Sequence, residues 1–264
     1  MNRQHLIETL AKIGPSAIAV SGGVDSMTLA CVAARSAMGF EIFHAISPAV
    51  PAQATERVKR YAELEGWTLR LIDAGEFSDP DYRANPLNRC FYCKTNLYGA
   101  IADKTSLPIL SGTNLDDLDD FRPGLSAAQS YNVRHPFVEA GIDKDTIRRI
   151  ARELELTDLS ELPAAPCLSS RVETGIRIEA TDLGLIERVE TLLTAQLGQV
   201  ALRCRIRKKG LCIEIDETLL AAKPQSDIEQ LIDDVQQLLP TDRYEISIEA
   251  YVRGSAFIGA KAHA

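Results

Sequence analysis

The sequence predicts an α/β protein with a parallel sheet in its first part and a smaller α/β domain in its second. Short apolar runs alternate with helical patterns through about 160 residues, which is typical of successive β-α-β units. The alternation ends at Pro163-Ala164-Ala165-Pro166, because closely spaced prolines prevent a helix and disfavour a central strand. Further helical and strand patterns follow over about 85 residues.

The first part is expected to open with a strand that runs directly into a glycine-rich turn and a helix. The run Ala17-Ile18-Ala19-Val20 is wholly apolar, which suits a strand buried on both faces of a parallel sheet. Asp143 stands in the N-cap position of a later helix. The expected strands are 17–20, 40–46, 68–72 and 108–112, and the expected helices reach residue 35, cover 53–65 and open at 143.

The second part is expected to hold two helices and three strands. The helices lie near 181–196 and 226–239, and the strands lie near 200–206, 211–215 and 244–251. We therefore predict one domain over 1–165 and a small α/β domain over 166–258. The remaining residues, 259–264, are expected to be a disordered tail.

The composition is ordinary for a globular protein, with 45% hydrophobic and 25% charged residues among 264. No run approaches the roughly 18 apolar residues of a membrane span, and the first residues lack the apolar core of a signal peptide. We therefore expect a cytoplasmic protein without membrane contact. The net charge of −8 argues against nucleic-acid binding as the main function, although the basic run 203–209 could form either a local basic site or a solvated hairpin.

A glycine-rich segment after the first strand predicts a phosphate site. It consists of Ser21, Gly22, Gly23, Val24, Asp25 and Ser26. A strand, a glycine turn and a helix together present backbone N–H groups to an anion, and the two glycines let a phosphate approach the backbone. The serines add hydroxyl donors, and Asp25 is expected to act through Mg²⁺, which prefers oxygen ligands. The alternative is a tight turn without a ligand.

The hexapeptide resembles the PP-loop signature of ATP-pyrophosphatases, which release pyrophosphate and transfer AMP; the lysine and the spacing of a Walker loop are missing. The resemblance implies ATP as substrate and a Rossmann-like parallel sheet of the PP-loop, or adenine nucleotide alpha hydrolase-like, type. A second segment, residues 111–117, stands at the end of the fourth strand; it includes Gly112-Thr113-Asn114 and the carboxylates of Asp116 and Asp117. Open α/β sheets bind ligands at the carboxyl ends of their strands, so this segment is expected to meet the same nucleotide; alone it would be an ordinary Asx-rich turn.

Three of the six cysteines form a candidate site. Cys90 and Cys93 are spaced so that a helix start would place both sulfurs on one face, about a turn apart. A second such pair that would complete a zinc site is missing from the sequence. Cys167 follows the proline break and is the natural third thiolate, with Arg171 close enough in sequence to lower its pKa.

These motifs together resemble the LarE-type ATP-dependent sulfur transferases, which act in biosynthesis of the nickel-pincer nucleotide cofactor. The resemblance covers nearly the whole chain, and only the phosphate loop is shared with PP-loop enzymes in general. The matching segments are 21–26, Asn85-Pro86, Arg89-Cys90, Cys93-Lys94, Gly112-Thr113-Asn114, Asp116-Asp117, Asp120, Arg122-Pro123-Gly124, Pro136, Glu139-Ala140-Gly141, 163–171, Arg203-Cys204-Arg205 and Ile213-Glu214.

The resemblance implies a small-molecule substrate, a pyridinium mononucleotide with ring carboxylates, and hints at a homo-oligomer. ATP would adenylate one carboxylate, and a thiolate would then displace AMP. In one version of the family Cys167 is the sacrificial sulfur donor and becomes dehydroalanine. In the other version, favoured here, Cys90, Cys93 and Cys167 hold a [4Fe–4S] cluster that carries the sulfur. A structural role for all three cysteines is the remaining alternative.

Substrate binding is assigned by the resemblance to Arg203 and Arg205, together with Arg171. Two residues apart on a strand, Arg203 and Arg205 point to one face while Cys204 points to the other. The alternative is that both are exposed strand positions. The match is poor over 206–210, and Cys212 stands where the family has a basic residue.

The remaining candidates are expected to be structural. Cys31, Cys204 and Cys212 are interpreted as small buried apolar residues, and the four scattered histidines as structural side chains: His5, His44, His135 and His263. Rival functions are another PP-loop enzyme, either a tRNA thiolase or an amide-forming synthetase, and a nonenzymatic nucleotide-binding sensor.

Overall fold

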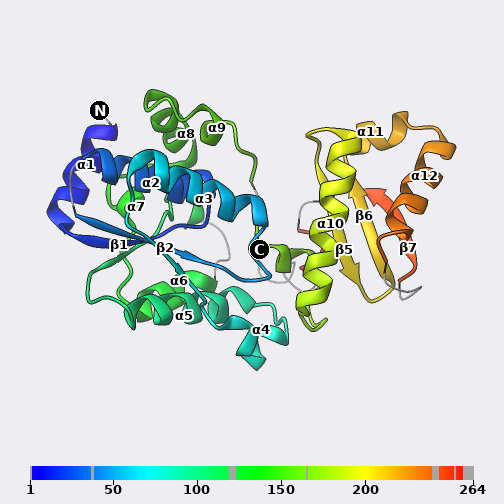
Figure 1. Cartoon of the computed structure of the whole chain (residues 1–264), viewed down its shortest axis with the longest axis horizontal. Coiled ribbons are helices and arrows are strands. Elements are labelled where there is room, and N and C mark those ends of the chain that lie inside the picture. Colours follow the sequence, from blue (N-terminus) through cyan, green and yellow to red (C-terminus); the bar gives the residue numbers. More distant parts are fainter. Residues whose placement is uncertain are drawn as a thin grey trace. The chain divides into compact units, whose positions relative to one another are not determined.

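The computed structural model describes residues 2–36, 39–118, 123–164, 166–239, 244–252 and 254–257. The chain packs into two compact units (Figure 1). The first unit comprises Met1–Asp79 with Asn88–Ala165, and the second comprises Pro80–Leu87 with Pro166–Ala264. The predicted tail, 259–264, lies outside the described residues.

The first unit is built on a four-stranded parallel sheet in the order β3-β2-β1-β4. Its strands are β1 (Ser16–Ala19), β2 (Phe40–Ala45), β3 (Leu69–Ile72) and β4 (Ile109–Leu110). The predicted parallel sheet is confirmed. The fourth strand is shorter than the predicted 108–112, because its pairing with β1 ends at Leu110. Gly112 then lies against the start of the helix that follows β1.

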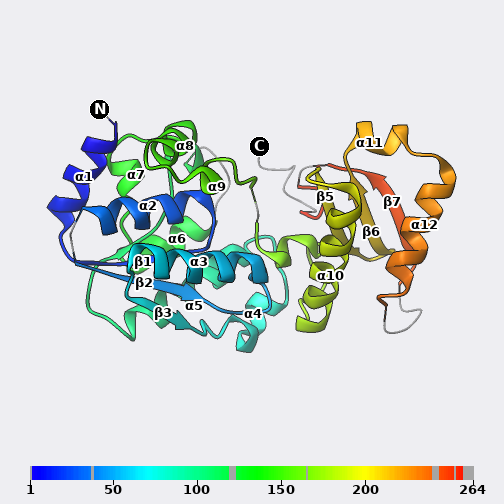
Figure 2. The same ribbon diagram turned by 45° about the horizontal axis from the view of Figure 1, so that its top comes forward.

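Helices cover both faces of this sheet (Figure 2). One core contains Ile18, Ile42 and Leu110 from the strands, and the opposite core contains Ala17, Phe43 and Ile109. The alternation follows from the two-residue period of a strand. The first core is filled by α1 (Asn2–Ile13), α2 (Val24–Arg35), α3 (Ala52–Glu65), α7 (Pro136–Glu139), α8 (Lys144–Glu153) and α9 (Thr157–Ser160), and the second by α5 (Arg89–Ala102) and α6 (Pro123–Ser130).

The second unit has a three-stranded sheet in the order β5-β6-β7. The strands β5 (Leu202–Arg207) and β6 (Gly210–Ile215) are antiparallel, and β7 (Ile246–Ala250) pairs with β6 in parallel. The helix α10 (Ala180–Leu197) packs against β5, and α12 (Gln225–Gln236) packs against β7. The smaller helices of this unit are α4 (Pro80–Arg83), η3 (Leu168–Arg171) and α11 (Glu217–Ala222), and the first unit adds the 3-10 turns η1 (Glu76–Ser78) and η2 (Leu115–Asp117).

The segment Pro80–Leu87 belongs to the second unit although it lies far from it in sequence. Tyr82 shares a hydrogen bond of 2.7 Å with the Ser169 hydroxyl. The Asn85 amide donates to the carbonyls of Val172 and Glu173, at 3.3 and 2.9 Å. The segment therefore supports the loop that follows Cys167. Within the described ranges, no helix is long and apolar enough to cross a membrane.

Candidate functional site

The loop between β1 and α2 has the backbone of a phosphate-binding turn. Gly22 adopts a φ of 81°, which favours glycine, and Gly23 is the N-cap of α2 without a capping side chain. The first N–H groups of α2 therefore have no side-chain acceptor from the cap residue, which is the arrangement that attracts anions. Val24 buries its side chain in the core, so it can serve a ligand only through its backbone.

The side-chain hydroxyl of Ser26 forms hydrogen bonds within the loop. The Ser26 hydroxyl accepts a hydrogen bond from the Ser21 N–H at 3.0 Å and lies 3.1 Å from the Ser21 hydroxyl. It also donates to the Gly23 carbonyl at 3.3 Å. Ser21 is exposed and Ser26 is buried, so Ser26 shapes the loop while Ser21 faces the open side.

The segment after β4 packs directly on the start of α2. A Cβ atom at Gly112 would lie 2.6 Å from the Ser26 nitrogen and 2.9 Å from its Cα. Such distances are below van der Waals contact, so only glycine fits without a backbone shift. The two segments that the sequence assigned to one nucleotide, 21–26 and 112–114, are thus in contact.

We expect Gly112→Ala to destabilise the first unit by roughly 1–3 kcal/mol and to weaken nucleotide binding, because the added methyl group must displace the α2 backbone. Denaturant unfolding and ATP titration would measure the two effects. Gly39→Ala is the control, since its Cβ would meet only the Pro15 Cβ at 3.9 Å. A Gly112→Ala variant as stable as that control would contradict the close packing.

Asp25 carries an unused carboxylate oxygen beside the loop. Its Oδ2 pairs with the Lys144 ammonium, while Oδ1 is buried and has no hydrogen-bond partner in the part of the chain that the structure describes. Burial raises the pKa of Asp25, Lys144 opposes this rise, and nearby Asp117 adds to it. A cation with oxygen ligands would satisfy Oδ1, which makes Asp25 a suitable Mg²⁺ ligand.

Lys144 is a site residue that the sequence analysis missed. It is the first residue of α8, and its backbone N–H donates to Asp116 at 2.9 Å. Its side chain reaches Asp25, 119 positions earlier. The N-cap Asp143 marked this helix in the sequence, but no local pattern indicates which loop its first residue would touch.

Asn114 shapes the turn after β4 rather than facing outward. Its side chain is buried and accepts a hydrogen bond from the Asp116 N–H at 3.0 Å, while the Asp117 carboxylate accepts from the Asn114 N–H at 3.2 Å. This reciprocal cap holds η2 in place. Thr113 is half-buried, with its hydroxyl 2.9 Å from that of Ser111.

Two histidines have different surroundings. Both ring nitrogens of His44 are occupied, by the Val20 carbonyl at 2.8 Å and the Thr55 hydroxyl at 2.9 Å, which agrees with a structural role. His135 places Nδ1 2.7 Å from the hydroxyl of Ser111, which directly precedes the segment 112–114 that the sequence predicts to meet a nucleotide. Burial lowers the pKa of His135, which favours its neutral form.

The first cysteine pair lies on the first turns of α5, as predicted. Cys90 is exposed and Cys93 is half-buried, and neither forms a disulfide. Gly124 on α6 approaches this turn closely, since its Cβ would lie 3.0 Å from the Lys94 Cγ and 3.6 Å from the Cys90 carbonyl. The matched segment around Gly124 therefore packs against the helix that carries the pair; Asp120 and Arg122 lie outside the described residues.

Cys167 lies in the second unit, half-exposed, directly before η3. Its carbonyl accepts a hydrogen bond from the Arg171 guanidinium at 3.1 Å, and the Pro166 carbonyl accepts another at 2.5 Å. Arg171 also forms a two-bond pair with Glu190, each bond 3.0 Å long. Arg171 is buried, so it holds the Cys167 loop; its predicted substrate role stays a prediction.

Arg203 and Arg205 share one face of β5, as predicted from their spacing. Arg205 is buried and pairs with Glu214 at 2.8 Å. Arg203 lies with its guanidinium 5.8 Å from the Tyr251 ring centre; burial and nearby Arg171 lower its pKa. The alternative of exposed strand positions is therefore wrong for Arg205, whereas substrate binding by either residue stays a prediction.

The other cysteines are buried, as expected: Cys31, Cys204 and Cys212. Burial raises the pKa of each of these thiols, which keeps them in the inert protonated form. The described ranges contain no group of three or more His, Cys, Asp or Glu side chains that could hold a metal ion. The three predicted cluster ligands are divided between the units, with Cys90 and Cys93 in the first and Cys167 in the second.

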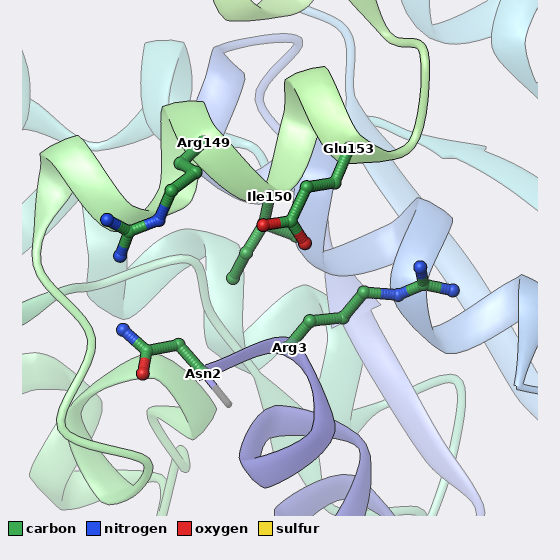
Figure 3. Close-up of a pocket in the computed structure, with 5 residues that line it drawn as sticks. All are labelled: Asn2, Arg3, Arg149, Ile150 and Glu153. Atoms are coloured by element: carbon green, nitrogen blue, oxygen red, sulfur yellow. The ribbon is translucent and has the colours of Figure 1, made fainter.

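A cavity of about 220 Å³ lies elsewhere in the first unit, between α1 and α8 (Figure 3). Its walls are formed by Asn2, Arg3, Arg149, Ile150 and Glu153. Figure 3 shows the guanidinium groups of Arg3 and Arg149 pointing away from each other. The cavity contains no residue of the phosphate loop and no convergent set of charges, so we place the functional site at the loop instead.

No family model matches the chain. A protein of Lactiplantibacillus plantarum, named pyridinium-3,5-bisthiocarboxylic acid mononucleotide synthase, is 26% identical over 219 residues, which cover 80% of this chain and 78% of that protein. The name states that this relative makes a nucleotide with two thiocarboxylic acid groups. The uncharacterized protein MJ0830 of Methanocaldococcus jannaschii is 29% identical over 206 residues, which cover 76% of this chain and 78% of the relative.

The uncharacterized protein slr1717 of Synechocystis sp. is 32% identical over 238 residues. The match covers 88% of this chain and 85% of that protein, so it includes both units. The chain therefore belongs to the same family as the Synechocystis protein slr1717.

Proposed function

We propose that the protein is an ATP-dependent sulfur transferase of the LarE type, within the PP-loop ATP-pyrophosphatases. The observation that carries the proposal is the contact of Gly112 with the first turn of α2. That contact joins two segments typical of one nucleotide site at the carboxyl ends of β1 and β4. The named Lactiplantibacillus relative supports a pyridinium mononucleotide as the acid that is activated.

The chain's own groups account for the adenylation step. The α2 N-terminus and the Ser21 hydroxyl bind the phosphates of ATP, and Asp25 holds Mg²⁺, which neutralises phosphate charge. A carboxylate oxygen of the substrate attacks the α-phosphorus, and the bond to pyrophosphate breaks. The product is an acyl adenylate, whose carbonyl carbon is a far better electrophile than that of a carboxylate.

The sulfur step replaces AMP by sulfur. A sulfur nucleophile attacks the carbonyl carbon, the bond to the AMP oxygen breaks, and AMP leaves. With Cys167 as donor, loss of its Cα proton and cleavage of its Cβ–S bond then release the thiocarboxylate and leave dehydroalanine. In the version that we favour, Cys90, Cys93 and Cys167 would hold a [4Fe–4S] cluster, which would supply the sulfide that is transferred.

The donor set suits a cluster chemically. All three residues are thiols outside disulfides, none is fully buried, and thiolates are the ordinary ligands of iron–sulfur clusters. Cys90 and Cys93 also belong to one helix turn, which lets both ligate one group. The substrate anion is assigned to Arg203 and Arg205, whose guanidinium groups match phosphate and carboxylate geometry. A homo-oligomer stays part of this proposal.

The protein is expected to release pyrophosphate from ATP·Mg²⁺ only when a pyridinium mononucleotide with ring carboxylates is present. In Asp25→Asn, release should fall by at least about 10-fold, because the metal ligand is lost. A coupled pyrophosphate assay measures both rates, and Asp145→Asn, an exposed position on α8, is the matched control. Pyrophosphate release that depends on tRNA as the activated substrate, or amide formation with ammonia as the nucleophile, would favour the rival PP-loop enzymes. Binding without release would favour a sensor.

A further inference from the structure

We propose that Arg57 is a positioning residue that orients the Gly22–Gly23 peptide of the phosphate loop toward the triphosphate. The inference rests on the ATP-binding part of the proposed function and adds a residue that lies outside the loop itself. Arg57 belongs to α3, whose first turns pack against the loop.

The key contact is a hydrogen bond from the Arg57 guanidinium to the Gly22 carbonyl, 2.9 Å long. The described peptide bonds include no cis bond, and across a trans peptide the C=O and the following N–H point in opposite directions. Holding the Gly22 carbonyl toward α3 therefore directs the Gly23 N–H away from α3. Among the described residues, that N–H makes a single long contact of 3.4 Å, to the Ser21 hydroxyl, so it can still donate to a phosphate.

The loop needs such a restraint because its glycines do not fix their own conformation. Gly22 has a φ of 81°, and glycine adopts either sign of φ with little cost. The α3 backbone limits this freedom from one side, since a Cβ at Gly22 would lie 2.7 Å from the Ala54 carbonyl oxygen. Arg57 adds the second restraint, a directed bond to the peptide that carries the phosphate-binding N–H.

Arg57 also lacks a paired carboxylate among the described residues. Burial lowers the pKa of Arg57; Asp158 and Tyr61 oppose this effect, and the neighbouring Arg60 adds to it. Arg60 forms an ion pair with Asp158, and Arg35 forms one with Glu65. Arg57, in contrast, makes no ion pair with a carboxylate of the described residues. A half-buried cation beside a phosphate loop is stabilised when an anion arrives.

Arg57→Met keeps the stem of the side chain and removes both the hydrogen bond and the charge. We expect it to weaken binding of ATP·Mg²⁺ and of pyrophosphate by about 10-fold each in calorimetric titration, while adenosine binds as to the wild type. Arg57→Lys, which keeps the charge but not the guanidinium geometry, should show an intermediate loss.

Lys59→Met is the control, because Lys59 lies on the same helix and its ion pair, with Glu56, is at the exposed surface. Its phosphate affinity should stay within about 2-fold of the wild type. A loss of structure would weaken adenosine and pyrophosphate together, so the selective loss of pyrophosphate separates positioning from misfolding. If Arg57→Met unfolds, the affinities of Arg57→Lys for adenosine and pyrophosphate are compared in the same way.

Two failures are distinguishable. Wild-type protein that binds neither ATP nor pyrophosphate would overturn the proposed function, and this inference with it. If the wild-type protein binds ATP, and Arg57→Met and Arg57→Lys bind pyrophosphate as tightly as the wild type does, only the role of Arg57 is overturned.

Discussion

Cys167→Ala is expected to abolish sulfur transfer while pyrophosphate release continues. The two activities are expected to separate because we propose that the phosphate loop of the first unit carries out adenylation, whereas Cys167 lies at the start of η3 in the second. Both versions of the sulfur step need the Cys167 thiolate, so thiocarboxylate formation should fall by at least about 100-fold. Mass spectrometry of the nucleotide product and a pyrophosphate assay on the same sample measure the two outcomes.

The matched control is Cys212→Ser, which replaces a buried thiol on β6 by a hydroxyl. Thiocarboxylate formation by Cys212→Ser should stay within a few-fold of the wild type. Undiminished product from Cys167→Ala would contradict any role of this residue in sulfur transfer. A loss of pyrophosphate release in the same variant would instead show that Cys167 is needed for the adenylation site.

The two versions of the sulfur step differ at Cys90 and Cys93. If a cluster carries the sulfur, Cys90→Ala and Cys93→Ala should each lose product and bound iron together after anaerobic purification. If Cys167 is the sacrificial donor, both variants should remain active, and the wild-type protein should lose the mass of H₂S once per chain. Apoprotein that thiolates with this mass change would exclude the cluster version.

Glu214→Gln is expected to produce the largest loss of stability in the second unit. Glu214 is 1% exposed and pairs with Arg205 at 2.8 Å and with Arg207 at 2.5 Å. The Ser255 hydroxyl donates to the same carboxylate. Neutralising Glu214 would leave one buried and one half-buried guanidinium without a counter-charge, which costs about 3–5 kcal/mol.

The Arg205 contact acts mainly through charge. Arg205 Nε and Glu214 Oε2 are 2.8 Å apart, yet neither atom has a well-aligned hydrogen bond to the described residues. Substitution by glutamine, which keeps the shape and removes the charge, is therefore the appropriate test. Hydrogen exchange of the β5 and β6 amides would localise the loss, because the single tryptophan, Trp67, lies in the first unit and cannot report on it.

Glu249→Gln is the control for this prediction. Glu249 is the register partner of Glu214 in the β6–β7 pair, but it is exposed. Removal of its charge should therefore change the free energy of unfolding by no more than about 0.5 kcal/mol. Equal exchange rates in Glu214→Gln and Glu249→Gln would show that the ion pairs contribute little.

Local patterns in the sequence were sufficient for the sheet and the phosphate loop. The apolar run before Ser21 predicted a buried strand, and β1, β2 and β3 lie close to their predicted places. The glycines at 22 and 23 predicted a turn into a helix, and the structure has that turn, with a positive φ at Gly22. These features depend on neighbouring residues alone, so the sequence expresses them directly. The division at 165 and the role of each site residue stay predictions.

Only the tertiary structure revealed which distant residues complete the site. Lys144 reaches Asp25 across 119 positions, and Arg57 reaches Gly22 across 35. The Pro80–Leu87 segment joins the second unit through contacts with residues near 169–179. Such contacts follow from how helices and loops pack, and a periodic pattern specifies which face of a helix is buried but not which residue it meets. The sequence by itself thus determined the strands and the loop, and packing decided which side chains support that loop.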